Sequence, residues 1–256
     1  MNILMLKLLL APVIIGGASL AGRRWGPNVS GWLIGLPLTS GPVAFFVAIS
    51  HNDTFAASTV LGTISGGLSL VVFCLAYAWL AKWFRWQWCI TGSMLCYGAV
   101  TLIMQNIILP LAVIFPLVIA VILAGIGLMP ASEQLKQQVA KPGKWDLPAR
   151  ILIGTSFILT LTGIAPLIGP RLTGLLSTIP LYTAILVIFA QRLQGPAGSV
   201  GVLRGLLFGL FGFTGFYLAL ALTIGKLNLG MAFLVATLAT LLIQGISLGA
   251  MHIFGK

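Results

Sequence analysis

The sequence predicts an all-α, polytopic transmembrane helix bundle, and composition is the first reason. Apolar residues fill 59% of the 256 positions, charged residues fill 7%, and the mean hydropathy is +1.11. A soluble domain carries about a quarter charged residues, so this chain could not cover its surface in water. The apolar runs are continuous and about 20 to 25 residues long. They suit helices that cross a hydrocarbon core of roughly 30 Å, rather than the alternating strands of a barrel.

About nine spans follow from these apolar runs. The fourth and fifth are separated only around Leu109 and Pro110. Residues 1–21 end like a signal peptide, but Arg23 and Arg24 follow at once, so we expect this segment to be retained as the first span. The expected spans are 3–22, 28–50, 56–81, 88–106, 107–129, 148–167, 172–190, 198–224 and 228–253.

The linker at 130–147 is the one clearly water-soluble stretch, and it contains two of the three acidic residues, Glu133 and Asp146. It divides the chain into two transmembrane units. The first unit, at 1–129, has about five expected helices, and the second, at 148–256, has about four. The linker itself is expected on the cytoplasmic side, because its basic residues fit that location.

The net charge of +11 is distributed as a topology signal. If the N-terminus is outside and the C-terminus is cytoplasmic, eleven basic residues fall on the cytoplasmic side and three on the outer side, as the positive-inside rule requires. No basic run is interleaved with aromatic residues, so the expected partner is the lipid bilayer and not nucleic acid. The cytoplasmic set is Arg23, Arg24, Lys82, Arg85, Lys136, Lys141, Lys144, Arg150, Arg192, Arg204 and Lys256; the outer set is Lys7, Arg171 and Lys226.

An internal repeat emerges when the chain is aligned with itself so that GPNVSGWLIGLPLTS (26–40) falls on GPRLTGLLSTIPLYT (169–183), an alignment that we call the repeat register. Matching glycines and prolines are the evidence for the repeat, because apolar residues match by chance in any two membrane helices. Five spans separate each element from its partner, so the second copy must cross the membrane in the opposite direction. Further matches are Gly62 with Gly205, Gly66 with Gly209 and, after a four-residue gap, Gln105 with Gln244.

The second and seventh spans carry helix-breaking residues, namely Pro37, Gly41, Pro42 and Pro180. Proline removes a backbone donor and clashes with the preceding turn. In lipid, the carbonyls that are freed need another partner, so interrupted helices line protein or a wet cavity. Ligands often bind at such breaks, held by half-helix ends and hydroxyl groups.

Six polar residues are the candidate substrate-binding site: Thr39, Ser40, Gln105, Tyr182, Thr183 and Gln244. Four of them follow the two prolines directly, and the two glutamines are the matched intramembrane amides. The hypothesis is that all six converge near the membrane midplane. A purely structural interpretation stays open, because Ser and Thr often bond a backbone carbonyl one turn away and a Gln between helices contributes only about 0.6 kcal/mol.

Several kinds of chemistry are not expected. With three acids in the chain there is no HExxH motif, no aspartate pair for Mg²⁺ and no Walker loop, so neither an enzyme nor a cofactor is predicted. Cys74, Cys89 and Cys96 lack metal-ligand spacing, so no metal site is predicted. Asp53 is the only acid near a span, which disfavours proton pumping through intramembrane carboxylates.

The two segments GPNVSGWLIGLPLTSGP and GPRLTGLLSTIPLYTAILVIFAQRLQGP share the pattern GPxx[ST]Gxxxx[LI]PL. They resemble a group of bacterial polytopic membrane proteins that has no assigned function. The resemblance implies the bacterial inner membrane and brings no substrate or catalytic residue. In architecture the chain is similar to inverted-repeat secondary transporters, including families with paired five-helix units. It departs from them because the last helix of its second unit is missing.

The expected function is therefore a secondary transporter or facilitator for a small neutral or anionic solute, by alternating access between the inverted repeats. Scarce intramembrane charge disfavours a multivalent cation, since no carboxylate is available to pair with it. Alternatives from other classes are a channel or lipid translocator, or a non-transporting membrane scaffold subunit. A homo-oligomer is compatible with the sequence.

Overall fold

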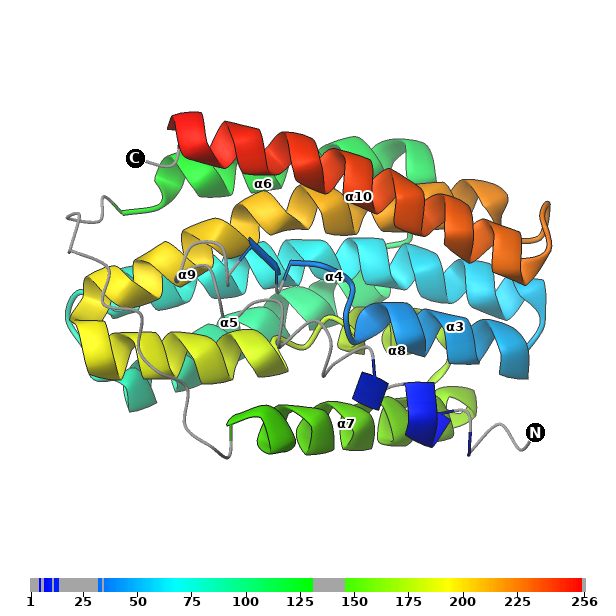
Figure 1. Ribbon diagram of the computed structural model, residues 1–256, viewed down its shortest axis with the longest axis horizontal. Helices are drawn as coiled ribbons and strands as arrows, with labels where there is room; N and C mark the ends of the chain where they lie inside the picture. Colours follow the sequence, from blue (N-terminus) through cyan, green and yellow to red (C-terminus); the bar gives the residue numbers. More distant parts are fainter. Residues whose placement is uncertain are drawn as a thin grey trace.

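The computed structural model describes residues 5, 7–10, 12–13, 32–33, 35–130 and 146–254. Most of segment 1–21, which is expected to be retained as the first span, lies outside the described residues, as do the beginning of the second span and nearly all of the linker. The described elements are all helices (Figure 1). They are α3 (Ser40–Ser50), α4 (Asp53–Leu80), α5 (Trp86–Asn106), α6 (Leu111–Leu128), α7 (Asp146–Ile168), α8 (Pro170–Leu176), α9 (Leu181–Thr223) and α10 (Leu229–Phe254).

Six stretches among the described residues are long and apolar enough to cross a membrane, so the helical membrane bundle predicted from composition is confirmed at this level. Five of them end within a few residues of an expected span, whereas Pro170–Thr223 is one stretch that covers the two expected spans 172–190 and 198–224. The described part of the second expected span is the 11-residue helix Ser40–Ser50, which is too short to be one of the six. The stretches are Asp53–Leu80, Trp86–Asn106, Leu111–Leu128, Ile151–Ile168, Pro170–Thr223 and Leu229–Gly249.

The fourth and fifth expected spans are two separate helices. Helix α5 ends at Asn106, and α6 begins at Leu111 after Pro110, whose φ of −67° suits the residue that caps a helix. The four residues between them are non-helical, and Ile107 and Ile108 are exposed at the end of the bundle. The short connection therefore makes α5 and α6 a hairpin.

Helix α9 contains a reversal of direction at Gly195. This residue has φ 71° and ψ −165°, a positive-φ conformation that glycine adopts without steric cost. Pro196 follows, and proline suits the first position of a new helix. Two helices, 181–194 and 196–223, are thus joined end to end, and Figure 1 shows α9 turning back at one end of the bundle.

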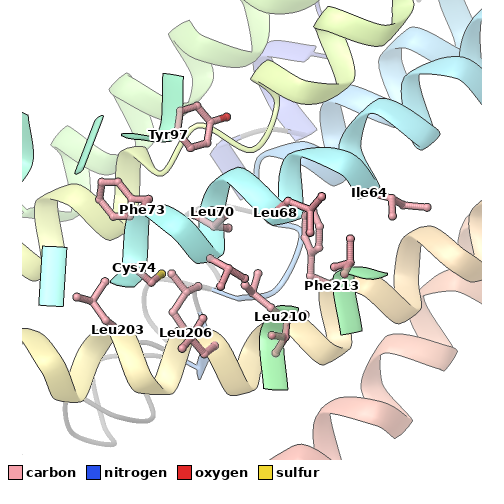
Figure 2. Packing of buried hydrophobic residues seen from close by; sticks show 14 of the residues in the cluster. Ile64, Leu68, Leu70, Phe73, Cys74, Tyr97, Leu203, Leu206, Leu210 and Phe213 are labelled. Carbon is pink, nitrogen blue, oxygen red and sulfur yellow. The ribbon is translucent and has the colours of Figure 1, made fainter. Parts of the chain in front are cut away.

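Helix α4 lies at the centre of the bundle. In its most apolar stretch 78% of the residues are buried, whereas in the most apolar stretches of α5, α6 and α10 only 22% of the residues are buried. Figure 2 shows apolar side chains of α4 packed against those of the second part of α9. A smaller cluster joins α3 to α7 through Val43, Phe46, Ile158 and Leu161. The outer helices keep large apolar side chains on the surface, as expected for contact with lipid.

Close backbone approaches at glycines hold α8 against α4. A Cβ atom on Gly174 would overlap the carbonyl oxygen of Thr59, and one on Gly62 would overlap that of Arg171. The second part of α9 approaches Trp32 and Gly35 in the same way, since a Cβ atom on Gly35 would lie 2.5 Å from the Cα atom of Gly209. Small residues at these crossings let the helix backbones come together.

Substitution of Gly174 tests this packing. Gly174→Ala should destabilise the protein by about 1 to 3 kcal/mol, because the added methyl group overlaps backbone atoms of α4 that cannot move independently. Gly163→Ala in α7 is the matched control, because nothing lies within 4 Å of a Cβ atom built there. Thermal unfolding of the purified variants measures the difference, and equal melting temperatures for both would refute the tight contact.

Candidate functional site

Two breaks in the helices lie near the middle of the bundle. Helix α8 ends at Leu176 and α9 begins at Leu181, and residues 35–39 are non-helical before α3 begins at Ser40. From the breaks, α3 and the first part of α9 run to opposite ends of the bundle (Figure 1). Pro37 lies in the first break and Pro180 caps α9, whereas Gly41 and Pro42 lie in the first turn of α3, where proline is tolerated.

The two breaks share one pattern of backbone hydrogen bonds. For each bond in the first break there is a bond in the second break between the two equivalent residues of the repeat register. In the first break the bonds are Gly35 N to Trp32 O (3.1 Å), Leu36 N to Leu33 O (3.1 Å), Leu38 N to Leu36 O (2.7 Å) and Gly41 N to Pro37 O (2.9 Å). In the second they are Thr178 N to Leu175 O (3.3 Å), Ile179 N to Leu176 O (3.0 Å), Leu181 N to Ile179 O (2.8 Å) and Ala184 N to Pro180 O (2.7 Å).

A cavity of about 40 Å³ lies between the breaks. One water molecule needs roughly 10 to 15 Å³ of such volume, so the cavity holds a very small solute. Apolar side chains from α4 and the second part of α9 complete the wall, and Figure 2 shows Leu70, Leu206, Leu210 and Phe213 packed together there. Six hydroxyl-bearing residues line it, two of them from the first break and four from the second: Thr39, Ser40, Ser177, Thr178, Tyr182 and Thr183.

The cavity brings together four of the six residues that the sequence singled out, namely Thr39, Ser40, Tyr182 and Thr183. Ser40 and Thr183 are each only 3% exposed. Within the described part of the chain, the Thr183 hydroxyl has no hydrogen-bond partner. The Ser40 hydroxyl lies near the Tyr217 hydroxyl of α9.

The hydroxyls of Ser40 and Thr183 lie where their helices begin. A threonine inside a helix normally donates to the carbonyl four residues earlier. For Ser40 and Thr183 those carbonyls belong to Leu36 and Ile179, which lie in the breaks before the helices start. Nine threonines elsewhere in the described helices make this bond: Thr59, Thr63, Thr91, Thr162, Thr173, Thr214, Thr223, Thr237 and Thr240. Thr101 bonds Ser69 instead, and the Thr155 hydroxyl has no partner among the described residues.

The structure does not bring the two glutamines to the cavity. Gln244 is 2% exposed and its Nε2 donates to the Trp32 carbonyl at 3.0 Å. Gln105 lies next to last in α5, and its Oε1 is buried with no hydrogen-bond partner among the described residues. Both glutamines therefore lie outside the group formed by the other four.

Tyr97 makes the contact that corresponds to the one made by Gln244. Its hydroxyl donates to the Leu175 carbonyl at 3.0 Å and lies 3.0 Å from the Thr178 hydroxyl. In the repeat register Leu175 is the equivalent of Trp32, the residue to which Gln244 donates. No sequence signal pointed to Tyr97, because a tyrosine and a glutamine do not align.

Ser177 and Thr178 were also missed by sequence reasoning, which considered only the residues after Pro180. Ser177 Oγ lies 3.2 Å from Thr63 Oγ1 and donates to the Gly174 carbonyl at 2.7 Å. The repeated segment GPRLTGLLSTIPLYT contains both residues, so the repeat was the signal that could have found them.

Comparison of the chain with protein-family models, with curated proteins and with solved structures finds no match. The function is therefore argued from the geometry of the cavity and of the two breaks.

Two tyrosines test how the site is supported. Tyr97→Phe should destabilise the protein by about 1 kcal/mol, because it removes a hydrogen bond to the Leu175 carbonyl. Tyr217→Phe is the matched control and should not destabilise, because the Tyr217 hydroxyl is buried without a hydrogen-bond partner. Chemical or thermal unfolding compares the two, and a larger loss for Tyr217→Phe would contradict this account.

Proposed function

We propose that the chain is a secondary transporter or facilitator of a small neutral or anionic solute, working by alternating access between two inverted repeats. The observation that carries the proposal is the pair of hydroxyls of Ser40 and Thr183, which belong to buried residues, are equivalent in the repeat register and line one cavity. Two hydroxyls in equivalent positions at helix breaks are suited to contact a ligand held between the two units.

The helix boundaries support the repeat. Helix α4 begins at Asp53, and the helix after the Gly195 reversal begins at Pro196, the equivalent position in the repeat register. Likewise α5 begins at Trp86 and α10 begins at the equivalent residue, Leu229. Together with the matched hydrogen bonds of the two breaks, these starts are consistent with two copies of one unit.

Packing between the two units is reciprocal. A Cβ atom on Gly66 would lie 2.5 Å from Thr178 Oγ1 and 3.0 Å from the Leu175 carbonyl oxygen. A Cβ atom on Gly209 would contact Gly35 and Trp32, which are the equivalents of Thr178 and Leu175 in the first unit. Each unit thus packs its long central helix on the broken helix of the other unit. Such reciprocal packing is what an exchange of conformations between inverted halves requires.

The proposed arrangement keeps the nine spans and the units 1–129 and 148–256 joined by the cytoplasmic linker 130–147. In it, α3 is the second half of the second span. Helix α8 and the first part of α9 together form the seventh span. The proposed ligand set is Thr39, Ser40, Tyr182 and Thr183, and Gln105 and Gln244 are left out of it.

The basic side chains support a membrane orientation. Lys82, Arg85 and Arg192 surround a groove where the α4–α5 connection meets the end of the first part of α9. At the other end of the bundle, Arg171 donates to the carbonyls of Met104 and Ile107. We place the first of these ends in the cytoplasm of a bacterium and the chain in its inner membrane, with the N-terminus outside.

Reporter fusions test this orientation. Green fluorescent protein fused after Lys256 should fluoresce and alkaline phosphatase fused there should be inactive, because the C-terminus is placed in the cytoplasm. Alkaline phosphatase fused to a chain truncated after Lys226, in the predicted outer loop, should be active. The reverse pattern would overturn the orientation and leave the fold unaffected.

Ligand screening and flux test the transport proposal. A bound solute should raise the melting temperature of the purified protein, since binding to the folded state adds about 2.7 kcal/mol at a hundred times the dissociation constant. The shift should be lost in Ser40→Ala and Thr183→Val. It should persist in Thr237→Val, whose hydroxyl faces outward and bonds only its own helix. The same solute should then show saturable counterflow in proteoliposomes.

Other outcomes favour the alternatives. Linear flux with single-channel steps would replace the carrier with a channel. Scrambling of labelled phospholipid would favour a lipid translocator. Liposomes that stay silent, combined with a stable partner protein after purification in mild detergent, would favour a scaffold subunit.

A further inference from the structure

A groove of about 420 Å³ lies at the end of the bundle where α9 reverses direction. It is lined by residues 81–86, at the connection between α4 and α5, and by Gln191, Arg192 and Pro196 of α9. Gln191 joins the two sides. Its Nε2 donates to the Phe84 carbonyl at 3.1 Å, and its Oε1 accepts from the Tyr77 hydroxyl at 2.7 Å. These hydrogen bonds hold the connection and α9 at a fixed separation, so the groove is part of the packed bundle.

The charge of the groove is positive. Lys82, Arg85 and Arg192 line it, and no acidic side chain among the described residues does. Lys82 Nζ lies 4.0 Å from the ring centroid of Trp79, and the Arg192 guanidinium lies 5.9 Å from that of Trp86. An aromatic ring attracts a cation without neutralising it. The exposed Arg85 side chain has no partner among the described residues. Three cations without a counter-ion therefore line one groove.

The repeat register shows that this charge does not come with the fold. The connection between α9 and α10 lies at the other end of the bundle, beside the start of α4 (Figure 1). A Cβ atom on Gly225 would lie 3.7 Å from that of Asp53, so the equivalent segments meet there too. The equivalents of the nine lining residues include one lysine, Lys226, and one acid, Asp53, and so have no net charge. The equivalents of Lys82, Arg85 and Arg192 are Gly225, Asn228 and Ile49.

The groove lies where a membrane-spanning bundle meets the lipid headgroups. Helix α4 ends at Leu80 and α5 begins at Trp86, and both are long and apolar enough to cross a membrane. Trp79, Trp83 and Trp88 near the groove are exposed, and tryptophan is enriched at the headgroup level. Lysine and arginine bind phosphate oxygens, and basic pockets between membrane helices bind anionic headgroups. Position and charge together favour a lipid phosphate over a soluble one.

We infer that this groove binds the phosphate headgroup of an anionic phospholipid through Lys82, Arg85 and Arg192. The groove shares no lining residue with the cavity between the helix breaks, so the inference does not depend on the solute that the protein carries. Two of the three cations belong to the connection between α4 and α5 and the third to α9. A bound headgroup therefore bridges the two segments and stabilises their packing.

Lipid titration tests the inference. The melting temperature of the purified full-length protein in dodecyl maltoside is followed as phosphatidylglycerol or phosphatidylcholine is added to the micelles at constant ionic strength. Phosphatidylglycerol should give a saturable rise, and phosphatidylcholine, which has no net charge, should give no saturable rise. Arg85→Gln and Arg192→Gln should each raise the half-saturating fraction of phosphatidylglycerol about fivefold, the usual contribution of one basic residue at an anionic lipid surface. Arg85→Lys keeps the charge and should bind as the unaltered protein does.

The triple variant Lys136→Gln, Lys141→Gln and Lys144→Gln is the matched control. It removes three basic residues predicted on the same side of the membrane and keeps the cations of the groove, so the half-saturating fraction should not change. The melting temperature without lipid shows that each variant is folded.

Four results would overturn the inference. They are no saturable rise with phosphatidylglycerol, an equal rise with phosphatidylcholine, an unchanged response in both groove variants, or an equal loss in the linker variant. A saturable rise with sodium phosphate or glycerol 3-phosphate in lipid-free detergent would also overturn it, because the groove would then serve a soluble phosphate compound.

Discussion

Backbone polar groups inside a bilayer have no water to bond, and each interruption of a helix leaves several of them without partners. In this protein α8 ends in mid-bundle, and its last carbonyls are bonded by the N–H groups and hydroxyls of residues 177–179 and by Tyr97. The backbone bonds recur around Trp32, without the hydroxyls and with an amide from α10 in place of the tyrosine. The position of α5 and α10 beside the breaks follows from this need.

Satisfying the carbonyls brings the helices close, and glycine makes the approach sterically feasible. Helix α4 can lie against α8 because Gly62, Gly66 and Gly174 present no side chain at the crossing. The resulting contact encloses the two breaks between α4 and the second part of α9. A cavity lined by hydroxyls and bounded by apolar side chains is the product of these two constraints together.

Much of this arrangement is predictable from the sequence because hydropathy and proline act locally. The long apolar runs gave span positions close to those of α4 to α7, and Pro37 and Pro180 marked both breaks. Contacts between distant helices were harder to predict. A four-residue gap in the repeat alignment pairs Gln105 with Gln244, because both are glutamines. Without the gap, Gln244 aligns with Thr101, which is one helical turn from Tyr97, the residue that makes the corresponding hydrogen bond. At this position the residues that match in type do not occupy equivalent places in the two units.

The crossing of α4 with α8 has a consequence for biosynthesis. Helix α4 is complete once Leu80 has been made, but the segment that covers its glycine face begins at Pro170. While the ribosome synthesises the intervening chain, 81–169, Thr59, Thr63 and the nearby backbone have no partner from the second unit. The glycine face of α4 therefore lacks its final packing partner until α8 has been made, and the first unit cannot reach its final packing by itself.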